Sequence, residues 1–110
     1  MFEIYQTESN KEYRFRLKDS DGTILLTGEG YKAKANCKKG VESVGKNGTV
    51  ETRYELKESS NGKFYYLLKA TNGQVIGQTK MHASEGDAHD NKAAIMKHCT
   101  GKCTDLTVTA

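Results

Sequence analysis

The side chains best suited to chemistry are three histidines and three cysteines, most of them in the last third of this 110-residue chain. That cluster consists of His82, His89, His98, Cys99 and Cys103. Imidazole nitrogens and thiolates are the ligands that zinc prefers in proteins. Adjacent residues point in different directions, however, and the cluster lacks the paired Cys-x-x-Cys spacing of a closed zinc site. We therefore expect no metal site, with Cys99 packed at the end of a helix and Cys103 in a loop.

Cys37 is a second candidate because Lys38 and Lys39 follow it, and nearby cations favour the reactive thiolate. It also lies on an apolar stripe with Val41 and Val44, which is typical of a small core residue. The sequence contains no Ser/His/Asp set, no phosphate-binding loop and no paired carboxylates in a motif context. We therefore predict that the protein has no catalytic residues and no cofactor, and is not an enzyme.

The formal net charge of +3 is spread over both halves of the chain. Composition alone therefore requires neither nucleic acid nor a membrane surface as a partner. Met1 is followed directly by strand-like alternation, without a basic and apolar leader or a run long enough to span a bilayer. An odd number of cysteines argues against a disulfide framework. We expect a cytoplasmic protein with reduced thiols.

The elements that must position these side chains are encoded twice. Residues 13–27 and 64–78 match in kind nearly position for position at an offset of 51, which indicates an internal duplication. Each copy alternates as a strand, reaches Asp21-Gly22 or Asn72-Gly73, and continues as a second apolar strand. These dipeptides favour tight primed turns, so each copy predicts a β-hairpin.

The remaining elements follow from changes in hydrophobic period. The pattern predicts a strand at residues 2–7, a helix at about 31–46, extended chain at 49–57, a second helix from Ser84 to about His98 and a final strand at 104–109 with Leu106 and Val108 on one face. Asp87, three residues after Ser84, completes a capping box. An offset of 51 pairs Cys37 with Ala88, and one of 52 pairs it with His89; both registers remain open.

A chain of this length and apolar content can bury one modest core, and no linker separates the two repeats. We therefore expect a single domain over residues 1–110, with repeats at about 1–52 and 53–110 sharing one core.

Four segments in combination resemble a known family. They are Phe-Glu-Ile-Tyr at 2–5, Tyr-Arg-Phe-Arg-Leu-Lys at 13–18, Gly-Val-Glu-Ser-Val at 40–44, and Arg-Tyr-Glu at 53–55 with Asn-Gly-Lys-Phe-Tyr at 61–65. Together they are similar to the YegP-like family of small bacterial proteins. The resemblance implies an α+β fold of two tandem β-β-β-α-β repeats that share one largely antiparallel sheet. It further implies helices on one face and last strands exchanged between repeats. It implies no chemistry, because the function of the family is uncharacterised.

Strand alternation predicts what the sheet face away from the helices carries. Its side chains would be Tyr5, Arg14, Arg16, Lys18, Leu25, Tyr65, Leu67, Lys69 and Ile76. Contiguous apolar surface at Leu25, Tyr65, Leu67 and Ile76 favours an unidentified protein partner, so we predict a monomeric interaction module. Aromatic and basic groups also suit single-stranded nucleic acid, which is the alternative. The simplest interpretation is that long Arg and Lys stems cover apolar residues.

Overall fold

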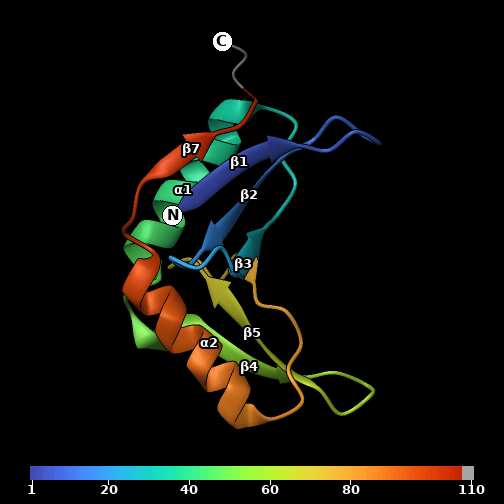
Figure 1. The fold of residues 1–110 in the computed structure, drawn as a ribbon, viewed down its shortest axis with the longest axis vertical. Coiled ribbons are helices and arrows are strands. Elements are labelled where there is room, and N and C mark those ends of the chain that lie inside the picture. The colour runs from blue at the N-terminus through green and yellow to red at the C-terminus, as the bar shows by residue number, and fades with distance from the viewer. Residues whose placement is uncertain (108–110) are drawn as a thin grey trace.

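The computed structural model describes residues 1–107, which form one curved sheet with two helices packed on the same face (Figure 1). The elements are β1 Phe2–Gln6, β2 Tyr13–Lys18, β3 Ile24–Gly28, α1 Lys34–Asn47, the 3₁₀ helix η1 Glu51–Arg53, β4 Tyr54–Glu58, β5 Phe64–Lys69, β6 Val75–Gln78, α2 Glu85–His98 and β7 Cys103–Asp105. The seven strands lie in the order β4-β5-β6-β3-β2-β1-β7. Neither helix is long and apolar enough to cross a membrane within these residues. The predicted α+β fold is confirmed.

The two helices begin and end at positions exactly one repeat apart, since α1 spans Lys34–Asn47 and α2 spans Glu85–His98. Cys37 and Ala88 are therefore equivalent, and both are fully buried. This settles the register of the two helices at an offset of 51. Ser84 caps α2 by accepting a hydrogen bond from the Asp87 backbone N–H, as the capping box predicts.

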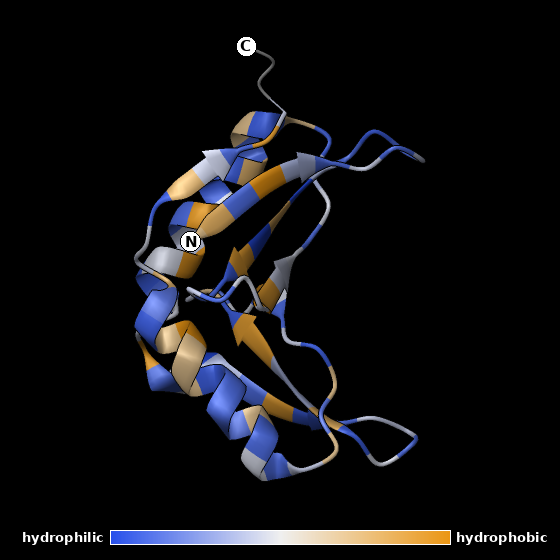
Figure 2. Cartoon of the chain, viewed as in Figure 1, coloured by the Kyte–Doolittle hydropathy of each residue, from blue (hydrophilic) through white to orange (hydrophobic). Residues whose placement is uncertain are grey.

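The repeats meet where β3 pairs with β6 in antiparallel orientation, with Thr27 opposite Gln78 and Gly28 opposite Gly77. The three-stranded units on either side are thus related by an approximate two-fold axis at this seam. The core lies between the sheet and the helices, and β1 and β2 alternate between hydrophobic and hydrophilic residues (Figure 2). Its fully buried side chains are Phe2, Ile4, Phe15, Leu17, Leu26, Cys37, Val44, Leu68, Ile95 and Cys99.

The hairpin turns differ from the prediction. Gly22 and Gly73 have a φ of 85°, whereas Asp21 and Asn72 do not enter the positive region that a primed turn requires. The Gly22 N–H instead donates to the Asp19 carbonyl at 3.1 Å. The expectation of primed turns is therefore wrong. Each loop has one glycine in the left-handed region, as in a three-residue hairpin loop with a bulge.

Those bulges change which residues face the core. The β2–β3 register shifts between Leu17 and Lys18, so that Leu17 opposes Leu26 and Lys18 opposes Ile24. Leu25 is left between the paired positions and is only 5% exposed, while Ile24 is 42% exposed. The second hairpin shifts in the same way.

In that hairpin Ile76 is the residue left between paired positions, and it is 6% exposed. Leu25 and Ile76 both belong to the hydrophobic core. Their predicted place on the open sheet face is wrong because the extra residue of each bulge interrupts strict alternation.

The two repeats differ in the structure of their last segment. β7, from the second repeat, pairs in parallel with β1 of the first, placing Cys103 opposite Phe2 and Asp105 opposite Ile4. The corresponding segment of the first repeat does not form a strand, because residues 51–53 are the 3₁₀ helix η1 and β4 begins at Tyr54. Strand exchange is therefore one-sided, and the prediction of extended chain throughout 49–57 is wrong over residues 51–53.

The predicted final strand is shorter than expected. β7 ends at Asp105, and Leu106 and Thr107 form a turn. Val108 and Thr109, which the pattern also assigns to this strand, lie outside the described residues.

Candidate functional site

The open face of the sheet is organised by a row of directly opposed residues that crosses six strands. From β1 to β4 this row reads Glu3, Arg16, Thr27, Gln78, Leu67 and Glu55. A glutamate thus stands near each end, and uncharged groups lie at the seam between the repeats. Polar groups therefore dominate the face that the sequence singles out.

In the first repeat the predicted cations are paired with a carboxylate. The Arg16 Nε donates to Glu3 Oε1 at 2.8 Å, and the Lys18 Nζ lies 3.0 Å from the same oxygen. These two hydrogen bonds lower the pKa of Glu3. The Arg16 guanidinium also lies 4.6 Å from the centre of the Tyr5 ring. Both cations and the aromatic ring are therefore engaged within the molecule.

The second repeat repeats this arrangement around Glu55. Lys57 Nζ lies 2.7 Å from Glu55 Oε1, and Lys69 bonds to the other carboxylate oxygen. Hydrogen bonds from Lys57 and Lys69 lower the pKa of Glu55 to about 2. Tyr65 and Leu67 are half-buried beside this group.

The structure thus keeps seven of the nine predicted residues on one face and moves Leu25 and Ile76 to the core. Sequence reasoning missed the two glutamates, although the same alternation that places Tyr5 on this face also places Glu3 there. It missed Ile24 because the bulge is not visible in the alternation.

At the seam the open face is hollowed by a depression of about 510 Å³. Its lining residues are Arg14, Ile24, Leu26, Thr27, Gly28, Glu29, Gln78, Thr79 and Lys80. Arg14 donates from Nη2 to the Gly28 carbonyl at 3.0 Å, while its buried Nε has no hydrogen-bond partner among residues 1–107. Among the described residues no carboxylate pairs with Arg14, so it differs from Arg16, Lys18 and Lys69.

The histidine and cysteine cluster is dispersed in the structure. His82 Nε2 is hydrogen-bonded to Asn91 Oδ1 at 2.8 Å, and His89 Nδ1 to the Tyr66 hydroxyl at 2.9 Å. Cys99 is buried at the end of α2, as expected. Cys103 is exposed and begins β7, so the expectation that it lies in a loop is wrong. Within residues 1–107 no three side chains of the metal-binding types come together.

Cys37 is fully buried, and its burial raises the pKa of the thiol to about 11. A thiol with this pKa is protonated at neutral pH, so the neighbouring lysines do not make it a nucleophile. The structure therefore places Cys37 in the core.

Two tandem copies of a unit of three antiparallel strands and a helix, sharing one sheet with a parallel exchanged strand, define the class of this fold. The chain belongs to the DUF1508 family, a domain family of unknown function, whose model matches residues 8–55 and 59–104. The resemblance to the YegP-like family is confirmed.

Individual relatives and solved structures support the same family assignment. The chain is 44% identical to the UPF0339 protein in the ptx operon 5' region of Stutzerimonas stutzeri, over 88% of this chain and 86% of that protein. It is 40% identical to the UPF0339 protein YegP of Escherichia coli K12, over 92% and 91% of the two chains. The solution NMR structure of YegP from E. coli matches with a TM-score of 0.91 at 38% identity, covering 99% of this chain and 94% of that one.

The NMR structure of the UPF0339 protein SO3888 from Shewanella oneidensis also matches, with a TM-score of 0.89 at 33% identity over 96% and 89% of the two chains.

Proposed function

We propose that this chain is a non-catalytic interaction module that binds a protein partner through the open sheet face, centred on the hollow at the seam. The observation that carries this proposal is the hollow itself, which is lined by the exposed Ile24 side chain and by Arg14, an arginine that forms no ion pair among residues 1–107. A concave surface that combines an exposed apolar side chain with an arginine that has spare hydrogen-bonding capacity is typical of a protein interface. The proposal treats residues 1–110 as one monomeric unit acting in the cytoplasm.

The ion pairs favour a protein partner over single-stranded nucleic acid. A strand of nucleic acid needs a continuous track of cations for its phosphates. On this face Arg16 and Lys18 share Glu3, and Lys57 and Lys69 of the second repeat share Glu55. Each pair would have to break before it could meet a phosphate.

Site-specific photo-crosslinking in cell extract tests the proposal. A benzophenone side chain introduced at Ile24 is expected to give discrete protein adducts, and Arg14→Glu is expected to abolish them. The matched control carries the same group at Val50, which is exposed but does not line the hollow. Adducts that are identical from both positions, or that survive Arg14→Glu, would show that the hollow is not the binding site.

A titration with short single-stranded RNA and DNA, followed by amide chemical shifts at low and physiological salt, tests the nucleic-acid alternative. Salt-sensitive shifts at Arg14, Arg16 and Lys18 would replace the protein-partner proposal by nucleic-acid binding, because phosphate contacts weaken steeply with salt.

A further inference from the structure

The two edges of the sheet are not equivalent, although the strands that form them are. β7 lies along the outer side of β1, whereas β4 forms the opposite edge with no strand beyond it among residues 1–107 (Figure 1). The duplication relates β1 to β4, since Phe2 opposes Leu17 and Tyr54 opposes the equivalent Leu68. The outer edge of β1 is therefore covered by β7, whereas the equivalent edge of β4 is open.

Backbone hydrogen bonds hold β7 along the edge of β1. Phe2 N–H donates to the Lys102 carbonyl at 2.7 Å, and Leu106 N–H donates to the Ile4 carbonyl at 2.8 Å. Alternate residues of β1 thus turn their backbone groups toward β7, as a parallel ladder requires.

The same alternation exposes backbone groups on β4. Ser59 N–H donates to the Lys63 carbonyl at 2.7 Å, which makes Ser59 and Lys63 a hydrogen-bonded pair of the β4–β5 hairpin. Because such pairs alternate, Leu56 and Glu58 direct their backbone N–H and C=O groups away from β5. Tyr54 N–H is already used, since it donates to the Glu51 carbonyl in η1. The free part of the edge runs from Leu56 to Glu58.

The residues that begin the two helices occupy equivalent positions in the repeats and carry opposite charges. Next to β7, Lys34 at the start of α1 pairs with Asp105 at 3.1 Å. The equivalent first residue of α2 is Glu85, which forms no ion pair within residues 1–107. Glu58, at the far end of β4, is likewise exposed and without an ion pair among those residues.

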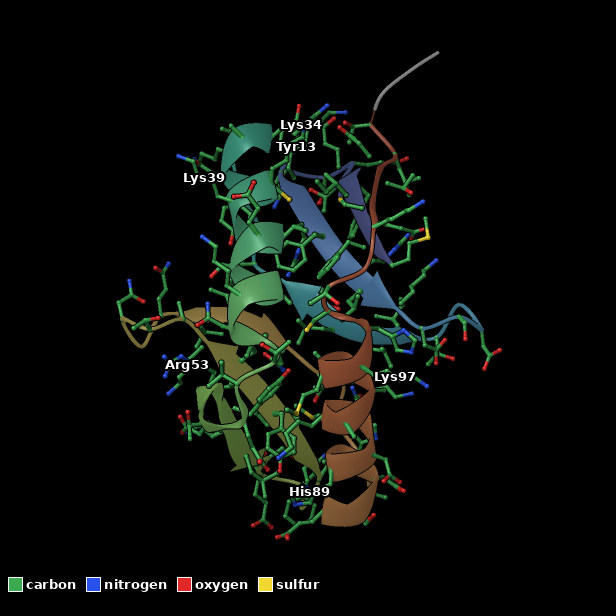
Figure 3. All side chains as sticks on the ribbon, turned by 90° about the vertical axis from the view of Figure 1, so that its left-hand side faces the viewer. Tyr13, Lys34, Lys39, Arg53, His89 and Lys97 are labelled. Atoms are coloured by element: carbon green, nitrogen blue, oxygen red, sulfur yellow. The ribbon has the colours of Figure 1, made fainter. Side chains whose placement is uncertain are left out.

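The lysine that α2 contributes to this flank is already engaged. Lys92 pairs with Glu51 at 3.2 Å and lies 5.0 Å from the centre of the Tyr66 ring. His89, seen at the α2 end of the molecule in Figure 3, is hydrogen-bonded to Tyr66, whereas Lys34 lies at the opposite end. Glu58 and Glu85 are therefore two carboxylates on this flank that form no ion pair among residues 1–107 and can meet an incoming chain.

We propose that the free edge of β4 accepts an extended segment of a partner protein, which adds to the sheet in parallel as β7 adds to β1. The segment has a Lys or Arg at the position that Asp105 occupies in β7, where it meets Glu85. Addition of a strand to an open edge is a common mode of peptide recognition, with affinity from the main chain and specificity from alternate side chains. This surface is separate from the hollow of the open face, so the two proposals stand or fall independently.

The charges also argue against β7 of a second copy as the occupant. Its Asp105 would lie next to Glu85, and two like charges replace the ion pair that holds β7 in its own site.

The test uses the full-length ¹⁵N-labelled protein and a synthetic peptide, acetyl-Ser-Thr-Lys-Leu-Thr-amide. This peptide copies residues 103–107 with the changes Cys103→Ser and Asp105→Lys. We expect it to shift the amide signals of Leu56, Lys57, Glu58 and Glu85. A matched peptide that keeps the aspartate is expected to bind roughly threefold to tenfold more weakly, the range for exchanging an attractive for a repulsive exposed charge pair.

Two controls make the result specific. N-methylation at the peptide Leu, the counterpart of Leu106, removes the main-chain bond and should abolish the shifts, whereas N-methylation at the preceding Lys should not. In the variant Glu85→Lys the preference between the two peptides should reverse. Unchanged β7 amide signals in that variant verify that it is folded.

Orientation is read with a spin label on either end of the peptide. In a parallel complex the label at the carboxyl end broadens Glu58, and the label at the amino end broadens residues nearer Tyr54. The proposal is overturned if β4 does not respond at millimolar peptide, if only β1 and β7 respond, if both peptides bind equally, or if the label pattern is reversed.

Discussion

The ring of Phe15 lies directly against the backbone of Gly28, so closely that a methyl group at Gly28 would come within 2.2 Å of the Phe15 Cε2 atom. Gly28 is part of the β3–β6 seam, and Phe15 is fully buried. The absence of a side chain at this one position lets an aromatic ring of the first repeat fill the core beneath the junction of the two repeats.

Gly28→Ala is expected to destabilise the fold by about 1–3 kcal/mol, because the buried ring must leave its position to accept the methyl group. Urea unfolding measures the loss. Gly45→Ala in α1 is the control, since its methyl group would meet nothing nearer than the Cys99 carbonyl at 3.5 Å. It should stabilise by about 0.5–1 kcal/mol through helix propensity. Equal effects of the two substitutions would contradict this account of the seam.

The two helix starts offer a matched pair of substitutions. Ser84 caps α2, whereas the equivalent Ala33 provides no side-chain cap for α1. Ser84→Ala should cost about 1 kcal/mol in the free energy of unfolding, and Ala33→Ser should add up to about 1 kcal/mol. Denaturant midpoints of the two variants measure both changes. A loss of stability in Ala33→Ser would show that the helix starts are not equivalent.

The pKa of Glu55, lowered to about 2 from an ordinary value of 4.5, predicts a dependence of stability on pH. Because the folded pKa lies below the unfolded one, the stabilisation is complete above about pH 4.5 and is lost as the pH falls toward 2. Glu55→Gln should therefore lower the melting temperature at neutral pH, and the difference from the parent protein should shrink over that acid range. A difference that is constant with pH would mean that Lys57 and Lys69 do not stabilise the ionised Glu55.

Thiol reactivity separates the three cysteines. Cys103 is exposed, whereas Cys37 and Cys99 are buried. Desolvation raises the pKa of all three thiols, so exposure rather than pKa distinguishes Cys103. With a disulfide reagent at neutral pH, the folded protein should release one equivalent quickly and the other two only on unfolding. Mass spectrometry of the modified protein assigns the fast site. A fast reaction at Cys37 would restore it as a candidate nucleophile.

Local sequence patterns were enough to place most of the helices and strands, whereas their arrangement in one shared sheet came from the family resemblance. The α2 cap, the repeat and the strand faces follow from local rules that hold at Ser84, Phe15 and Leu17, where each side chain has the burial its spacing predicts. Leu25 and Ile76 could not be placed in this way, since each bulge buries two consecutive residues of its strand and its position depends on pairing with the neighbouring strand, which the sequence pattern does not show.

The candidate site was less predictable for a related reason. Counting cations on the open face gives Arg16 and Lys18 as free charges, but a charge is free only if no partner reaches it across the sheet. Glu3 does so from β1, 13 positions before Arg16. The 3₁₀ turn at η1 likewise depends on how the chain must pass from α1 into β4, which residue types at positions 51–53 do not encode.

The parallel pairing of β1 with β7 has a consequence for biosynthesis. Cys103 is added to the growing polypeptide long after Phe2, the residue it lies opposite. During synthesis the outer edge of β1 therefore stays uncovered until the chain has been translated as far as β7. Contacts of such long sequence separation also slow folding after release. A nascent chain arrested before Lys102 would thus have open strand edges at both β1 and β4. At that stage a chaperone would have two edges to cover instead of one.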